Sequence, residues 1–218
     1  MLLSAEHLSI NFGSRQLLED VNFYLNEGDK VGVIGINGTG KSTFLKILLG
    51  EEAGAGRIKF GPTVKWAYLP QIIHFAHPER TLLDTMLYEK NCTVQTARDR
   101  LGAYLFEGED VFKTVGSLSG GEQSRLRLCM LMDEKINLLI LDEPVTGLDP
   151  ASMQDLYKTL RYLNEREGMA IIMVTHDMEN ALREAKHILS FDRRGCFYGT
   201  VGEFLSSPAG KRFGGEKR

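Results

Sequence analysis

One run of residues in this chain has the types and spacing needed to hold a phosphate group. Residues 35 to 42 read Gly-Ile-Asn-Gly-Thr-Gly-Lys-Ser and fit the pattern G-x-x-x-x-G-K-[ST]. In such a loop backbone N–H groups wrap phosphate oxygens, the lysine places a point charge on the β- and γ-phosphates, and the serine offers its hydroxyl to Mg²⁺. The run therefore predicts nucleoside triphosphate binding through the following residues: Asn37, Gly38, Thr39, Gly40, Lys41, Ser42 and Thr43.

A second run suited to anions follows about 80 residues later. Leu118-Ser119-Gly120-Gly121-Glu122 stands directly before a segment with helical character, roughly 121 to 132. Two glycines after a serine leave backbone N–H groups free to face an anion, and the helix adds its positive N-terminal end. We interpret Ser119, Gly120, Gly121 and Glu122 as a second set of phosphate-binding residues.

Two carboxylates follow an apolar run at Leu138-Leu139-Ile140-Leu141. Asp142 would hold Mg²⁺, directly or through water, and Glu143 would polarise an attacking water as general base. A strand that ends in Asp-Glu is weak support by itself. Here it follows a phosphate loop and the serine–glycine run, and the three together favour hydrolysis of a nucleotide.

The elements that must position these residues alternate between strand and helix at both ends of the chain. We expect strands over 2–12, 20–25, 30–34, 57–60, 64–69, 138–141, 169–174 and 187–191, with 57–60 and 64–69 joined by a turn at Gly61-Pro62. We expect helices over 41–49, 151–167, 178–185 and 201–206, and helical segments without a clear strand over 72–135. The Gly/Lys-rich end from Pro208 to Arg218 is expected to fray. The pattern predicts an α/β core with a helical lobe.

Composition places few other limits on function. The 218 residues are 43% apolar and 25% charged, with a net charge of −3, so we expect a packed domain and no direct DNA binding. Three widely spaced cysteines indicate reduced thiols in a cytoplasmic protein. We see no signal peptide and no apolar run of membrane-spanning length. A position at the inner face of a membrane would need a partner chain.

Taken together, the three runs with Asp149 and His176 resemble the ATP-binding cassette (ABC) ATPase family across the whole chain. The resemblance implies a P-loop NTPase fold of the ABC type, with a mixed sheet core and a helical subdomain. It also implies one nucleotide-binding domain over 1–218, divided into a core (1–71 and 136–218) and the subdomain (72–135).

The resemblance further assigns roles to single residues. Gln71, in Tyr68-Leu69-Pro70-Gln71, matches the family's Q-loop glutamine, which touches Mg²⁺ or water. Asp149 matches the D-loop, and His176 matches the switch histidine that contacts the γ-phosphate. Phe12 stands where the family places an aromatic ring against adenine, although it also suits a plain core position. The implied metal ligands are Ser42, Gln71 and Asp142, and the implied catalytic residues are Glu143, His176 and Gln71.

The implied activity is hydrolysis of Mg-ATP to ADP and phosphate in a head-to-tail dimer of two copies. ATP would lie between residues 35–42 of one copy and 119–122 of the other.

Signals for the subfamily point in two directions. Up to about residue 140 the chain resembles the ABC-F class, whose members act on ribosomes; 28–35, 105–113 and Glu122 carry this likeness. From about 144 onward it resembles ATPase subunits of zinc or manganese importers, through 145–150, 175–180 and 197–201. Several readings stay open: an importer subunit with a membrane permease partner, a ribosome-associated factor, a chimera with little or no activity, and a divergent cassette.

Overall fold

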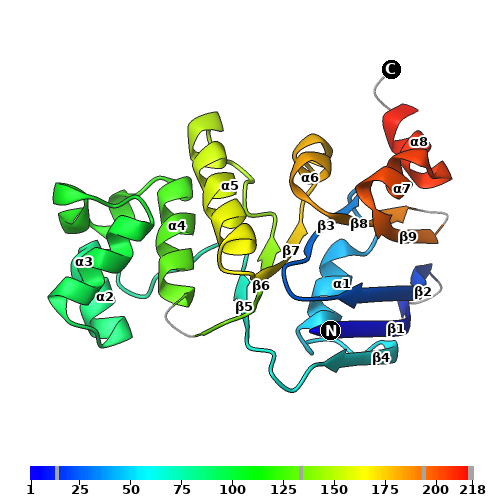
Figure 1. The fold of residues 1–218 in the computed structure, drawn as a ribbon, viewed down its shortest axis with the longest axis horizontal. Coiled ribbons are helices and arrows are strands. Elements are labelled where there is room, and N and C mark those ends of the chain that lie inside the picture. The colour runs from blue at the N-terminus through cyan, green and yellow to red at the C-terminus, as the bar shows by residue number, and fades with distance from the viewer. Residues whose placement is uncertain (13–14, 133–134, 193–194, 216–218) are drawn as a thin grey trace.

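The computed structural model describes residues 1–12, 15–132, 135–192 and 195–215 (Figure 1). The strands are β1 (Leu3–Phe12), β2 (Arg15–Leu25), β3 (Lys30–Gly35), β4 (Ala55–Phe60), β5 (Trp66–Leu69), β6 (Leu138–Asp142), β7 (Ala170–Val174), β8 (His187–Asp192) and β9 (Gly195–Thr200). The α-helices are α1 (Lys41–Leu48), α2 (Leu82–Lys90), α3 (Val94–Ala103), α4 (Gly120–Leu131), α5 (Pro150–Glu165), α6 (Met178–Glu184), α7 (Val201–Ser206) and α8 (Pro208–Gly215). Two 3₁₀ turns cover Gly108–Phe112 and Val115–Ser117.

A six-stranded sheet forms the centre, with strand order β5-β6-β7-β3-β8-β9. The first five strands are parallel, and β9 pairs antiparallel with β8. Residues of β3 and β7 are buried throughout, as the continuous apolar runs of strands covered on both faces predict. A second, antiparallel sheet has the order β2-β1-β4, and its β2 contacts β9. The expected mixed-sheet α/β core is confirmed.

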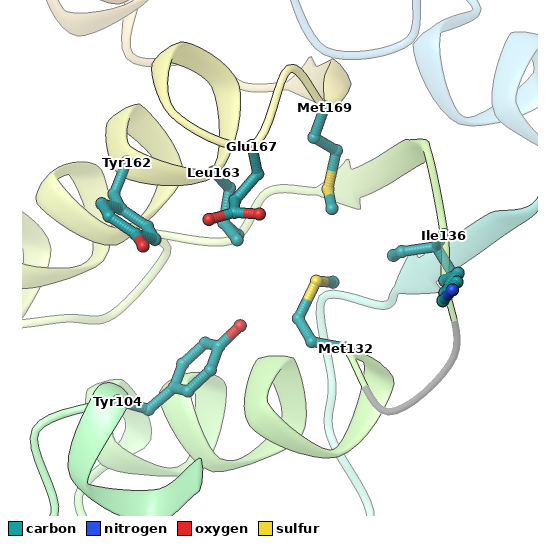
Figure 2. A pocket seen from close by; sticks show the side chains of 8 residues that line it. Tyr104, Met132, Ile136, Tyr162, Leu163, Glu167 and Met169 are labelled. Carbon is teal, nitrogen blue, oxygen red and sulfur yellow. The ribbon is translucent and has the colours of Figure 1, made fainter. Parts of the chain in front are cut away.

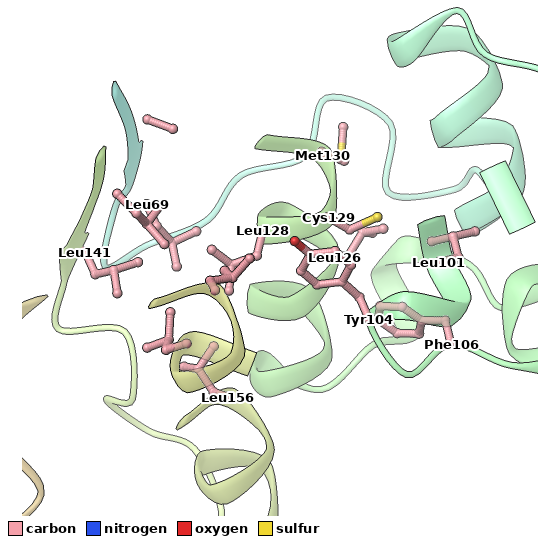
Figure 3. Close-up of a cluster of buried hydrophobic side chains, with 14 of the residues drawn as sticks. Leu69, Leu101, Tyr104, Phe106, Leu126, Leu128, Cys129, Met130, Leu141 and Leu156 are labelled. Carbon is pink, nitrogen blue, oxygen red and sulfur yellow. The ribbon is translucent and has the colours of Figure 1, made fainter. Parts of the chain in front are cut away.

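Apolar clusters cover both faces of the central sheet. On one face, α1 and the antiparallel sheet pack against the central strands. In this cluster the Phe23 and Phe44 rings meet edge to face, with centroids 5.9 Å apart. On the other face α4 and α5 pack against β5, β6 and β7, and this cluster runs on through Leu126 and Leu128 to Leu101 and Phe106 (Figure 3). A third cluster lies between β3, β8 and the helices α6, α7 and α8.

Between residues 72 and 132 the regular elements are helices, as expected. The helices α2, α3 and α4 gather at one end of the molecule (Figure 1). In the described part of this stretch, the β-pairing is limited to an isolated bridge between Thr81 and Thr114. Thr81 and Thr93 cap α2 and α3, since each hydroxyl accepts a hydrogen bond from a backbone N–H three residues on. Among the described residues, no helix combines the length and apolar character needed to cross a bilayer.

Near the C-terminus the structure corrects two expectations. β9 is a regular strand that the sequence reading missed, because its two glycines mask the aromatic pair Phe197-Tyr198 that packs inward. Residues 208–215 form α8 rather than fraying. A Cβ atom on Gly210 would lie 2.1 Å from the Phe204 carbonyl oxygen, so this glycine permits close packing of α8 on α7.

The turn at Gly61-Pro62 joins strands of different sheets. β4 pairs with β1, whereas β5 pairs in parallel with β6. The two runs therefore share a connection but no hydrogen-bonded ladder, and β5 lies beside the strand that ends at Asp142.

Candidate functional site

The residues predicted to act on a nucleotide lie at one edge of the central sheet. The loop before α1 follows β3, Asp142 ends β6, and His176 stands two residues after β7. β7 lies between β6 and β3 and runs parallel to both. Because parallel strands end at the same edge, the topology brings these segments together.

Glycine conformation makes the loop before α1 tight. Gly38 and Gly40 have φ values of 78° and 103°, which favour glycine. A Cβ on Gly35 would lie 2.6 Å from both the Phe191 carbonyl oxygen and the Thr39 hydroxyl. Thr39 closes the turn, since its N–H and its hydroxyl both donate to the Ile36 carbonyl, at 3.3 and 2.8 Å. Asn37 and Gly38 stay exposed at the tip.

Lys41 holds a buried positive charge beside this loop. Its Nζ donates to the Gly35 carbonyl oxygen at 2.6 Å, so the ammonium bridges the base of the loop. Burial lowers the pKa of Lys41, and the charges of Glu143 and Asp142 act in the opposite direction. Ser42 is exposed and Thr43 half-buried in the first turn of α1. A loop with exposed N–H groups and a buried ammonium suits a phosphate chain.

Asp142 is half-buried at the end of β6. Burial, and then the charge of Glu143, raises the pKa of Asp142. The Tyr68 hydroxyl on β5 donates to Asp142 Oδ2 at 3.4 Å. Burial and the nearby Asp142 raise the pKa of Tyr68 to about 12. A half-buried carboxylate next to a second one is a fitting ligand for a hard divalent cation, which would relieve their repulsion.

Glu143 and His176 meet in this structure. Glu143 adopts a left-handed backbone, φ 48°, and its N–H donates to the Val174 carbonyl at 2.9 Å. Its Oε2 pairs with His176 Nδ1 and accepts from the His176 N–H and the Thr146 hydroxyl, both at 3.3 Å. The predicted base is thus held by three donors, of which Thr146 had not been expected.

The serine–glycine run opens α4. The Ser119 hydroxyl accepts from the Glu122 N–H at 3.3 Å, and the Glu122 carboxylate accepts from the Ser119 N–H at 2.8 Å. This reciprocal pair is a capping box. Lys113 lies 3.6 Å from the other Glu122 oxygen and offsets its charge.

The N-terminal turns of α4 and α5 pack against each other. A Cβ on Gly121 would lie 2.5 Å from the Ser152 Cβ, and one on Gly120 would lie 3.3 Å from Leu148. Asp149 caps α5 by accepting from two backbone N–H groups, at 3.0 and 3.1 Å, and the hydrogen bonds from Ser152 hold the pKa of Asp149 below its usual range. These contacts join α4 to α5 and include no residue of the loop before α1.

Two further predicted residues stand apart from these contacts. Gln71 is exposed in the segment after β5, two residues beyond its end. Phe12 ends β1, and its side chain lies outside the part of the chain that the structure describes.

A crevice of about 420 Å³ lies between the C-terminal ends of α4 and α5 (Figure 2). Tyr104, Met132, Leu163 and Met169 are among its walls, and Glu167 points into it. Ile136 and Met169 precede β6 and β7, so the crevice lies at the opposite sheet edge from Asp142 and His176.

A phosphate loop after β3, an acidic end of β6 and a helical insert define the class of P-loop ATPases. The sequence profile described as "ABC transporter" matches residues 18–146, and the chain belongs to this family as an ABC ATPase domain. Its fold matches an inward-facing structure of an ABC transporter described as metal-chelate type, with a TM-score of 0.81, 26% identity, and coverage of 95% of this chain and 86% of that one. The expected family and fold class are confirmed.

The chain is similar both to zinc import ATP-binding proteins and to translational throttle proteins. It is 32% identical to the zinc import ATP-binding protein ZnuC 2 of Aliivibrio fischeri, over 95% of this chain and 86% of that protein. It is 34% identical to the energy-dependent translational throttle protein EttA of Escherichia coli K12, over 89% of this chain but 35% of that protein. Each match crosses residue 140 and covers most of the chain, so the comparisons give no support to a chimera.

Proposed function

We propose that this chain binds Mg-ATP and hydrolyses it to ADP and phosphate when two copies meet head to tail. The observation that carries the proposal is the meeting of Lys41, Asp142, Glu143 and His176 at one sheet edge, beside a loop that only glycines can form. We also propose that 1–218 acts as one nucleotide-binding domain, with a core (1–71 and 136–218) and a helical subdomain (72–135).

Phosphate binding falls to the loop and to Lys41. The Lys41 ammonium, now donating to the Gly35 carbonyl, would turn its remaining donors to the β- and γ-phosphates. Backbone N–H groups of 37–43 would surround the same oxygens. Because Lys41 is buried, its charge is weakly screened and acts strongly on a phosphate.

Metal binding would fall to Ser42, Gln71 and Asp142, all of which carry oxygen donors. When bound, Mg²⁺ would offset the negative charge that develops on the phosphates during hydrolysis. Gln71 follows β5, the parallel neighbour of the strand that ends at Asp142, so it leaves the sheet at the same edge as Asp142.

Water activation would fall to Glu143, positioned by His176. In the described structure, the Glu143 Oε2 atom accepts from His176 and Thr146, so it is occupied. A shift of His176 toward the γ-phosphate would free the carboxylate to take a proton from the attacking water. His176 is 59% exposed at its side chain and has room for this movement.

Completion of the site would need a second copy. Ser119, Gly120 and Gly121 at the start of α4 would face the partner's ATP, with Glu122 as the capping residue and Asp149 at the adjacent start of α5. The packing of α4 on α5 supports this, because it fixes the start of α4 against the start of α5. Phe12 is proposed to stack on adenine.

For the cellular role, we propose the ATPase subunit of a metal-ion importer, bound to a membrane permease at the inner face of the membrane. The likeness to ZnuC 2 spans 86% of that protein, whereas the likeness to EttA spans 35% of a longer one. A ribosome-associated role is the second candidate, favoured by the identity to EttA.

The test compares ATP hydrolysis by the purified chain with that of Glu143→Gln. We expect the variant to lose about 100-fold or more in rate, the range of a general base, and to dimerise in ATP by light scattering. Glu165→Gln, at an exposed position of α5, is the matched acid-to-amide control and should keep the rate. Equal rates for the wild type and Glu143→Gln, or a variant that stays monomeric with ATP, would refute the proposal.

A further inference from the structure

Tyr68 touches Asp142, although neither the sequence pattern nor the comparisons give this tyrosine a role. Its hydroxyl donates to Asp142 Oδ2 at 3.4 Å, joining two strands that are far apart in the chain. The contact matters because Asp142 is the carboxylate best placed to bind a divalent cation.

Strand register explains why the two side chains meet. In the parallel pair of β5 and β6, Tyr68 stands opposite Ile140. Alternate residues of a strand share a face, so Asp142, two residues after Ile140, lies on the same face and one step nearer the sheet edge. Both Tyr68 and Ile140 belong to the apolar cluster beneath α1, which confirms the shared face.

The tyrosine ring is fixed by its packing. It is half-buried against the cluster that contains Phe44 and Leu48 of α1, so its hydroxyl is held at the edge near Asp142. A donor on one carboxylate oxygen limits rotation of the carboxylate, as outer hydrogen-bond partners of metal ligands do.

The same strand leads directly to Gln71. Tyr68 stands three residues before Gln71, with Leu69 and Pro70 between them. Leu69 is fully buried, so it anchors the end of β5. The hydroxyl contact thus joins β5, the strand just before Gln71, to the strand that ends at Asp142.

We propose that Tyr68 is a positioning residue for Mg²⁺, acting through its hydrogen bond to Asp142. The inference rests on the proposed function, since it needs Asp142 to hold the metal of Mg-ATP. Tyr68 itself does not touch the metal or the phosphates. Its contribution is to hold one carboxylate oxygen so that the other side of the group faces the loop.

The test is an Mg²⁺ titration of Tyr68→Phe at a fixed concentration of a fluorescent ATP analogue. The readout is the Mg²⁺ concentration that gives half-maximal binding. We expect it to rise roughly tenfold, the low end for lost outer partners of metal ligands, because 3.4 Å is a long hydrogen bond. Affinity for the analogue in EDTA should stay unchanged.

Tyr198→Phe is the matched control. The Tyr198 hydroxyl also donates, to the Tyr24 carbonyl oxygen at 2.5 Å, and its ring packs on Phe23. Its loss should leave the Mg²⁺ midpoint unchanged. Thermal unfolding of both variants separates a loss of fold from a loss of metal affinity.

Two results would overturn the inference. One is an unchanged Mg²⁺ midpoint in Tyr68→Phe. The other is an equal loss of nucleotide affinity in EDTA and in Mg²⁺, since the hydroxyl would then support the fold rather than the metal. A wild-type chain whose nucleotide binding is indifferent to Mg²⁺ would refute the proposed function and this inference together.

Discussion

Gly121→Ala tests the packing that joins the start of α4 to the start of α5. The new Cβ would lie 2.5 Å from the Ser152 Cβ, which is a main-chain-anchored atom and cannot rotate away. We expect one of the two helices to shift, at a cost of about 1–3 kcal/mol for overpacking. Alanine returns up to about 1 kcal/mol of helix propensity, so the middle of that range, about 2 kcal/mol, leaves a net loss of about 1–2 kcal/mol.

Two separate measurements test this: thermal unfolding, and ATP-dependent dimerisation. A net loss of this size lowers the Tm by about 2–8 °C in a domain of this length. The shift of Ser119 and Asp149 relative to each other should also weaken dimerisation of a Glu143→Gln background.

Two further variants isolate the cause. Gly102→Ala lies in α3, where a Cβ would meet nothing within 4 Å, so it should raise the Tm by about 1–4 °C through helix propensity alone. Adding Ser152→Gly removes the opposing Cβ, so in a double-mutant cycle the loss caused by Gly121→Ala should nearly vanish in the Ser152→Gly background. A Gly121→Ala chain as stable as Gly102→Ala, or no rescue by Ser152→Gly, would refute the reasoning.

Further predictions concern the buried ion pair between Lys30 and Glu184 and the contact between His176 and Glu143. Lys30→Met removes one partner of the buried Glu184 carboxylate and leaves Arg161 and Arg183 beside it, so it should cost about 1–3 kcal/mol in urea unfolding; a loss below about 0.5 kcal/mol would contradict this. Burial acts to raise the pKa of Glu184, but Arg161 and Lys30 hold it below its ordinary 4.5, so this stabilisation is present above about pH 4.5 and is lost as pH falls through the lowered value. Glu184→Gln should flatten that acid limb of the stability curve. His176→Ala should lower the ATPase rate about 10- to 100-fold while affinity for a fluorescent ATP analogue stays within about threefold, because Glu143 loses its positioning partner; a rate like that of the wild type would speak against the role of His176.

Local sequence was sufficient to predict the loop and the acidic strand end. Gly38 and Gly40 need left-handed backbone, and the turn they form is the same wherever the motif occurs. Asp142 and Glu143 follow a short, continuous apolar run, which is typical of a buried strand. Parallel topology then places the loop and the acidic strand end at one edge of the sheet. The general arrangement of the site could therefore be predicted from the sequence.

Contacts between segments that are distant in the chain could not be predicted from the sequence. Tyr68 stands 74 residues before Asp142 in the chain and reaches it only because β5 and β6 are neighbours in the sheet. Likewise Gly210 looked like a sign of fraying, whereas its lack of a side chain allows α8 to close on α7. In each case the deciding quantity is a distance across the fold, which no local pattern contains.

The capping box at Ser119 has a consequence for how readily two copies would close. Its hydroxyl accepts from the Glu122 N–H with a lone pair, and this use leaves the hydroxyl hydrogen itself uncommitted by the cap. The residue is therefore already ordered in the single chain, so an arriving anion meets a preorganised donor rather than a segment that must first be immobilised. Opening and closing of a dimer would then leave this end of α4 unchanged, so ordering it would take little from the free energy of dimerisation.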